Sequence, residues 1–176
     1  RDSLIKRDNV RVCVPRYLQI GKGSLNELPE IIKILGSINS LLIVTDKQMV
    51  KFGYVKKLQE VLSKEGIKSD VFDDTVPDPT DTVVLNGINF LEKCKNDAVI
   101  GFGGGSPIDT AKAIAAMAKY SKNIQDYKPP SIFDKKGLPI IAIPTTAGTG
   151  SEVTHHAVII DSKNNEKISC RGEGFV

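Results

Sequence analysis

Short apolar runs alternate along this chain with segments in which apolar residues recur at helical spacing. The runs predict strands at residues 17–21, 41–45, 68–72, 98–103 and 138–143. The helical spacing predicts helices that begin near Pro29, near Tyr54 and after Thr80. Because strands and helices that alternate through short connections build parallel sheets, we expect an α/β fold. This fold is a Rossmann-like, mostly parallel sheet with helices on both faces.

The pattern changes after residue 150. Residues 153–160 and 167–170 alternate around a polar stretch, which predicts a C-terminal β-hairpin. Residues 120–137 contain Pro129-Pro130 and are expected to form an exposed loop. Ser24 and Glu27 have the spacing of a capping box at a helix start.

Length and composition indicate one domain over residues 1–176, with residues 1–11 as an irregular leader. The net charge of +3 and the absence of Trp argue against nucleic-acid binding. No apolar run approaches the roughly 20 residues that cross a bilayer. Cys13, Cys94 and Cys170 form no C-x-x-C pair, which predicts free thiols and a cytoplasmic location.

Three consecutive glycines, Gly103 to Gly105, follow the strand predicted at 98–103. Glycines accept positive φ and leave no side chain between the amides and a ligand. Ser106 is a suitable N-cap, Pro107 suits the first helical turn, and Asp109 has capping-box spacing. The free N–H groups of this helix start predict an anion site, with a ligand-free turn as the alternative. The third glycine of G-x-G-x-x-G is missing, so this turn alone names no function.

Polar residues also follow two other predicted strands, at the sheet edge where α/β folds bind ligands. The carboxylate of Asp46 can accept both hydroxyls of a ribose and would repel a 2′-phosphate, which favours NAD over NADP. The alternative is a cap for the next helix, and the two roles are compatible. Thr145, Thr146, Gly148 and Thr149 form a small polar wall that fits a ribose or carboxamide, or a plain polar loop. His155 and His156 are expected to point to opposite faces, which disfavours a shared metal.

Residues 103–112 (GGGSPIDTAK) and 143–154 (IPTTAGTGSEVT) together resemble the iron-containing (group III) alcohol dehydrogenase family. Residues 20–25, 44–46 and 76–80 resemble the same family in order and spacing. The likeness extends over about residues 12–170. It implies a nucleotide-binding α/β domain that is followed, in the family, by a helical metal-binding domain.

The resemblance also implies contacts with the coenzyme. Asp46 would bind the adenosine ribose, and the glycines with Ser106 would hold the diphosphate. Asp78 would lie near the adenine, although several relatives carry asparagine there, and Lys167 would reach across the cleft. His156 stands where many members place an aromatic residue. The expected cofactor-binding residues are Asp46, Asp78, Gly103, Gly104, Gly105, Ser106, Asp109, Thr145, Thr146, Gly148, Thr149, His156 and Lys167.

The family holds a divalent iron or zinc ion with one aspartate and three histidines of the helical domain. We expect these ligands to lie outside this sequence, so that the chain binds NAD without oxidising a small alcohol on its own. Its partner would be a second copy or a complementing helical chain. The alternatives are a nucleotide-binding regulatory module without turnover and, less favoured, a polyol-phosphate dehydrogenase or carbocycle-forming synthase.

Overall fold

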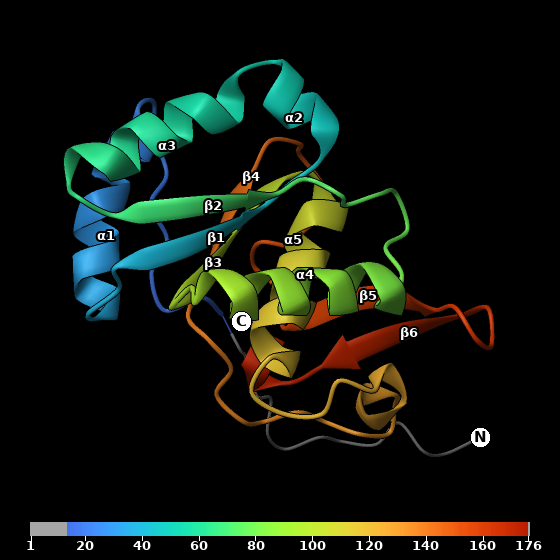
Figure 1. The fold of residues 1–176 in the computed structure, drawn as a ribbon. Helices are drawn as coiled ribbons and strands as arrows, with labels where there is room; N and C mark the ends of the chain where they lie inside the picture. The colour runs from blue at the N-terminus through green and yellow to red at the C-terminus, as the bar shows by residue number, and fades with distance from the viewer. Residues whose placement is uncertain (1–13, 176) are drawn as a thin grey trace.

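The computed structural model describes residues 14–175, so the expected leader and Cys13 lie outside the described part. Four parallel strands form the central sheet in the order β2-β1-β3-β4 (Figure 1). They are, in chain order, β1 (Ser40–Val44), β2 (Lys68–Phe72), β3 (Ala98–Gly103) and β4 (Ile140–Pro144). Leu42 pairs with Asp70 on one side and with Val99 on the other, and Val99 pairs with Ile140. The predicted parallel sheet is confirmed.

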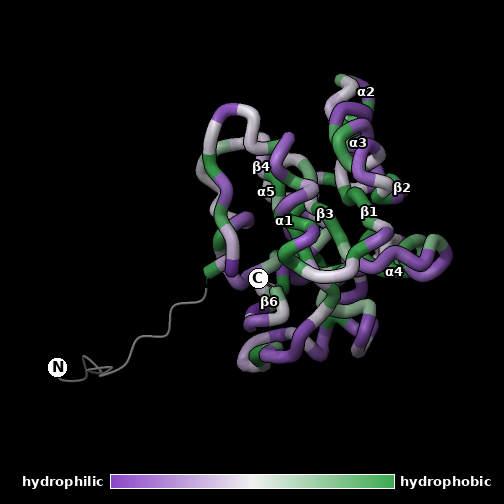
Figure 2. Tube along the Cα trace, turned by 90° about the vertical axis from the view of Figure 1, so that its left-hand side faces the viewer, coloured by the Kyte–Doolittle hydropathy of each residue, from purple (hydrophilic) through white to green (hydrophobic). Residues whose placement is uncertain are grey.

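Helices cover both faces of the sheet, as the sequence predicts (Figure 1). One face carries α1 (Leu28–Leu35), α2 (Lys47–Lys51) and α3 (Tyr54–Lys64). The other carries α4 (Asp81–Cys94) and α5 (Gly105–Met117). Since side chains alternate along a strand, Leu41 and Ile43 pack under the first group, and Leu42 and Val44 under the second. Figure 2 shows the resulting apolar interior of the inner strands.

The predicted C-terminal hairpin is present as β5 (His156–Asp161) and β6 (Glu166–Arg171), paired antiparallel. Ala157, Ile159 and Ile168 join the same buried cluster as α5, so the hairpin forms an extra layer over that helix. The backbone N–H of Ile160 donates to the carbonyl of Pro79 at 2.8 Å, which ties the hairpin to the segment before α4.

Two N-terminal predictions are wrong. Residues 17–21 form no strand: their backbone pairs with no strand of the described chain, and Ile20 is 88% exposed. Ser24 and Glu27 do not form a capping box. They lie in the 3-10 helix η1 (Ser24–Glu27), whose N-cap is Gly23, and Glu27 accepts a hydrogen bond from Gln19. Pro29 lies in the first turn of α1, which confirms the predicted start of that helix.

The segment 120–137 is not simply an exposed loop. Its 3-10 helix η2 (Ile124–Tyr127) buries both Ile124 and Tyr127. The Tyr127 ring lies 5.1 Å from that of Phe133 and 6.0 Å from that of Phe175, which belongs to the last element, η3 (Glu173–Phe175). Aromatic packing therefore fixes a stretch whose prolines suggested only a turn. Strand β4 is half-buried because it forms the edge of the sheet.

Within the described residues, no helix combines the length and apolar character that a membrane crossing requires. The described cysteines, Cys94 and Cys170, are free thiols, in agreement with the expectation for them.

Gly101 allows helix α5 to lie close against strand β3. A Cβ at this position would lie 2.9 Å from the Cα of Ile108 and 3.0 Å from the Cβ of Ala111. We expect Gly101→Ala to lower the free energy of unfolding by about 1–3 kcal/mol, because the added methyl forces strand and helix apart. Urea denaturation would measure this.

The matched control for that substitution is Gly104→Ala. Its backbone φ is −78°, and its Cβ would meet nothing closer than the Thr146 hydroxyl at 3.5 Å. It should leave the free energy of unfolding within about 0.5 kcal/mol of the wild type. Equal losses in the two variants would contradict the close-approach role of Gly101.

Candidate nucleotide-binding site

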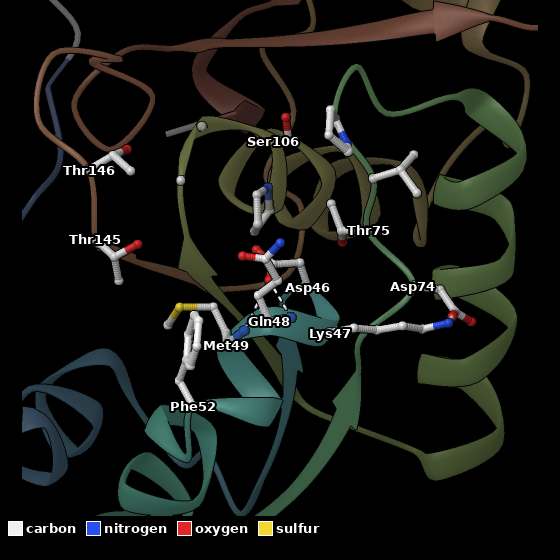
Figure 3. Close-up of a pocket in the computed structure, with 15 residues that line it drawn as sticks. Asp46, Lys47, Gln48, Met49, Phe52, Asp74, Thr75, Ser106, Thr145 and Thr146 are labelled. Atoms are coloured by element: carbon white, nitrogen blue, oxygen red, sulfur yellow. Dashed lines mark hydrogen bonds and ion pairs between the residues drawn. The ribbon is translucent and has the colours of Figure 1, made fainter.

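A cavity of about 600 Å³ opens at the carboxyl ends of the central strands (Figure 3). This volume lies within the range of about 300–1,000 Å³ that is typical of ligand sites. Backbone hydrogen bonds beyond the strand ends fix its rim. The N–H of Thr145 donates to the carbonyl of Gly103 at 2.9 Å, and the N–H of Thr75 donates to the carbonyl of Thr45 at 3.3 Å. Six of the predicted residues line it, namely Asp46, Gly104, Gly105, Ser106, Thr145 and Thr146.

The start of helix α5 forms one wall of the cavity. Gly104 is the N-cap and no side chain caps the helix, so the predicted N-cap role of Ser106 is wrong. The backbone already turns at Gly104, which leaves Ser106 inside the first turn. The unpaired N–H groups of a helix start attract anions, and here they border the cavity at Gly104, Gly105 and Ser106.

Asp109 has neither the predicted capping role nor a place in the cavity wall. Its Oδ2 accepts a hydrogen bond from the backbone N–H of Val158 at 3.0 Å and so joins α5 to β5. Burial raises the pKa of its carboxyl group. The capping-box spacing failed as a guide because the helix begins one residue before Ser106.

Gly103 and Gly104 lack a side chain for different structural reasons. Gly103 has a φ of 145°, and its Cβ would lie 2.9 Å from the Cγ of Pro107, so the fold itself excludes a side chain. Gly104 has an ordinary φ and open space in front of it. Positive φ is therefore confirmed for Gly103 alone. No neighbouring atom requires a glycine at 104, whereas a ligand that approaches the backbone would.

Asp46 has the predicted capping role, and its role toward a ribose stays a prediction. Its Oδ1 accepts the backbone N–H groups of Gln48 at 2.9 Å and Met49 at 3.0 Å, which caps α2. Its Oδ2 faces the glycine turn, 3.7 Å from where a Cβ of Gly103 would stand. One oxygen thus holds the helix and the other borders the space beside the glycines.

Thr75 also lines the cavity and was not predicted. Its side chain is 6% exposed, and its hydroxyl has no hydrogen-bond partner within residues 14–175. A buried hydroxyl without a partner costs free energy, so this atom fits a polar ligand group. The signal was available, because residues 73–75 follow a strand just as Asp46 and the glycines do.

The remaining predicted residues lie outside the lining of this cavity. Lys167 Nζ forms an exposed ion pair with Asp78 at 2.6 Å, which links the hairpin to the segment before α4. Thr149 packs toward Gly105, whose Cβ would lie 3.3 Å from that of the threonine. Gly148 is exposed.

The prediction that the two adjacent histidines point to opposite faces is wrong. Their ring centroids lie 4.3 Å apart, because His155 precedes β5 and does not share its alternation. His156 contacts the Ser169 hydroxyl through Nδ1 at 3.2 Å, and burial lowers its pKa. Over residues 14–175, no cluster of three or more His, Cys, Asp or Glu residues could hold a metal ion.

Lys112 is a buried residue of α5 that was not among the predicted site residues. Its Nζ donates to the carbonyl oxygens of Thr154 and, at 3.1 Å, His156. It therefore fixes the segment that follows the threonine-rich loop of the cavity. Burial lowers the pKa of Lys112 to about 8, although the carboxylates of Asp109 and Glu152 act in the opposite direction.

The lowered pKa of Lys112 predicts a pH-dependent stability. Between about pH 8 and 10.5 the unfolded chain retains this proton more fully than the folded chain, so the contribution of Lys112 to stability rises with pH. The difference in free energy of unfolding between the wild type and Lys112→Met should grow in this window by on the order of 3 kcal/mol. Urea denaturation at several pH values would measure it, and a constant difference would contradict a buried, titrating Lys112.

Comparisons with known proteins agree with this architecture. The family model described as iron-containing alcohol dehydrogenase matches residues 15–176. Long-chain-alcohol dehydrogenase 1 of Geobacillus thermodenitrificans is 39% identical over 152 residues, which cover 85% of this chain and 38% of that protein.

Two solved structures resemble the fold. The structure of 1,3-propanediol oxidoreductase matches with a TM-score of 0.88 and 31% identity, over 94% of this chain and 43% of that one. Sulfoacetaldehyde reductase from Bifidobacterium kashiwanohense, solved in complex with NAD+, matches with a TM-score of 0.79 and 35% identity. This match covers 88% of this chain and 41% of that one. The chain spans about two fifths of the length of these relatives.

Proposed function

The chain belongs to the iron-containing alcohol dehydrogenase family, and we propose that its cavity binds NAD for hydride transfer between NAD and a small alcohol or aldehyde. The observation that carries the proposal is Gly104. The fold leaves room for a side chain there, the chain has none, and the bare backbone lies at an uncapped helix start. The relative that was solved with NAD+ supports the choice of ligand.

The residues of the cavity suit the parts of this coenzyme. The N–H groups at Gly104, Gly105 and Ser106 would hold the diphosphate, whose charge the helix start stabilises. Asp46 would accept a hydroxyl of the adenosine ribose through Oδ2 and disfavour the 2′-phosphate of NADP. Thr145 and Thr146 border the same space. When bound, NAD supplies the nicotinamide ring that accepts or donates the hydride.

Other expected contacts rest on the family resemblance. Asp78 and Lys167 form an ion pair outside the cavity lining, and His156 lies over α5. Contacts of these residues, of Gly148 and of Thr149 with the coenzyme remain predictions.

The metal of the family does not fit the described residues, since no donor cluster is present over residues 14–175. The proposal is that iron or zinc is held by residues outside this sequence, in the same polypeptide or in a complementing chain. On this view the 176 residues alone bind NAD in the cytoplasm without turnover.

Titration calorimetry with NAD, NADP and the Gly104→Ala variant tests the proposal. We expect NAD to bind more tightly than NADP, because the carboxylate of Asp46 repels a 2′-phosphate. Gly104→Ala should weaken NAD binding at least about tenfold, since its methyl would occupy the approach to the helix start. Its unchanged free energy of unfolding serves as the control. Absence of binding by either nucleotide would overturn the proposal.

The same samples can test the absence of turnover. With NAD, ethanol and ferrous or zinc ions, the chain should form no NADH above background at 340 nm. Alcohol oxidation by the chain alone would refute the need for outside metal ligands.

A further inference from the structure

We propose that the outer face of the β5–β6 hairpin binds a negatively charged end of the substrate, so that the alcohol or aldehyde carries a carboxylate or sulfonate group. This inference rests on the proposed function and names the chemical class of its substrate. The residues that carry it are Arg171, His156 and Ser169, which are half-buried.

The two faces of the hairpin differ in character because side chains alternate along its strands. The face toward α5 is apolar and buried, with Ala157, Ile159 and Ile168 in the core. The outer face is partly open to solvent, and half of its residues are basic while none is acidic. Its members are His156, Val158, Ile160, Lys167, Ser169 and Arg171.

Arg171 is the one charge of this face without a partner in the part of the chain that the structure describes. Its guanidinium belongs to none of the ion pairs among residues 14–175. Its Nε is buried and forms no hydrogen bond there. Lys167, in contrast, is paired with Asp78. Because a buried donor without an acceptor costs free energy, Arg171 suits an added acceptor, and its single charge suits a monoanion.

Two polar side chains lie beside this guanidinium. His156 is directly opposite Arg171 across the two strands, and Ser169 is two residues away on the same face of β6. The Ser169 hydroxyl lies 3.2 Å from Nδ1 of His156. A guanidinium can donate two parallel hydrogen bonds to one oxyanion, and the hydroxyl and ring add donors next to it.

The electrostatic surroundings of His156 agree with a positive site. Burial lowers the pKa of its ring, and the charges of His155, Arg171 and Lys112 lower it further. Only Asp109 acts in the opposite direction, and its Oδ2 already accepts the N–H of Val158.

The outer face borders the coenzyme cavity at both of its ends. At one end Lys167 contacts Asp78, which directly follows Pro77 of the cavity wall. At the other end, His156 is reached through the loop that follows Thr146, which also lines the cavity. A molecule that extends out of the cavity therefore meets this face.

The basic end of the face lies on the side of the site that the adenosine leaves open. Strand β5 runs along α5, and the carbonyl of His156 accepts a hydrogen bond from Lys112 of that helix at 3.1 Å (Figure 1). Lys112 is eight residues beyond Gly104, which is roughly 12 Å along the helix. With the diphosphate at Gly104 and the adenosine at Asp46, the nicotinamide half would extend toward this end. A substrate beside it could present its far end to Arg171.

Three small alcohols test the inference. 4-Hydroxybutyrate and 1,4-butanediol have the same chain length and differ in the charge of one end, and 2-hydroxyethanesulfonate offers a second oxyanion. We expect at least one of the two anions to shift the Nε–H signal of Arg171 and the ring signals of His156 in the NAD-saturated chain. At the same concentration and ionic strength, 1,4-butanediol should shift neither signal. Heteronuclear NMR on the full chain measures this.

Two variants make the result specific to Arg171. Arg171→Gln should weaken binding of the anion about tenfold or more, since a hydrogen bond to a charged group is lost, while its affinity for NAD stays unchanged. Lys163→Gln removes the same charge from the exposed turn of the same hairpin and should bind the anion as the wild type does. Thermal unfolding checks that both variants are folded.

The outcomes separate this inference from the proposed function. If the chain binds NAD but responds alike to the anions and the diol, the charged end of the substrate is refuted while the coenzyme site stands. Equal anion affinity of Arg171→Gln and the wild type would refute it as well. A loss of NAD affinity in Arg171→Gln would assign the guanidinium to the coenzyme instead. If the wild type binds no NAD, both proposals fall.

Discussion

The close contact between strand β3 and helix α5 determines the shape of the site. Gly101 lets the helix lie against the strand, and Gly103 makes the turn that a side chain would block. Together they place an uncapped helix start at the carboxyl edge of a parallel sheet, where its N–H groups border a cavity. Without that contact, Gly104 would be an ordinary loop residue, and the electrostatic preference for an anion would not arise.

The neighbouring segments are fixed by a few polar contacts that converge on the same edge. The Thr45 hydroxyl donates to the carbonyl of Phe102 at 2.7 Å, which joins the ends of β1 and β3. Lys112 secures the chain beyond the threonine-rich loop from within α5. Asp46 uses one carboxylate oxygen to hold α2. These hydrogen bonds therefore hold the segments of the site in place and leave other polar groups free for a ligand.

Regular elements with strong patterns were predictable from the sequence. The inner strands and the helices near Pro29, near Tyr54 and after Thr80 occur where the periodicity places them, because local and tertiary preferences agree there. The predictions failed where contacts with distant parts of the chain determine the local structure. Residues 17–21 look like a strand but have no partner strand among residues 14–175, and the carboxylate of Asp109 accepts a hydrogen bond from Val158 of the hairpin. The position of Thr75 after a strand was visible in the sequence, but the burial of its hydroxyl depends on the packing of loops that no local pattern encodes.

The central claim is that backbone N–H groups at the start of α5 bind the diphosphate of NAD. Amide chemical shifts of the ¹⁵N-labelled chain, followed during titration with NAD and with inorganic pyrophosphate, address it directly. The account predicts that the amides of Gly104, Gly105 and Ser106 shift most with both ligands. Shifts confined to other parts of the chain, with these three amides unmoved, would contradict it.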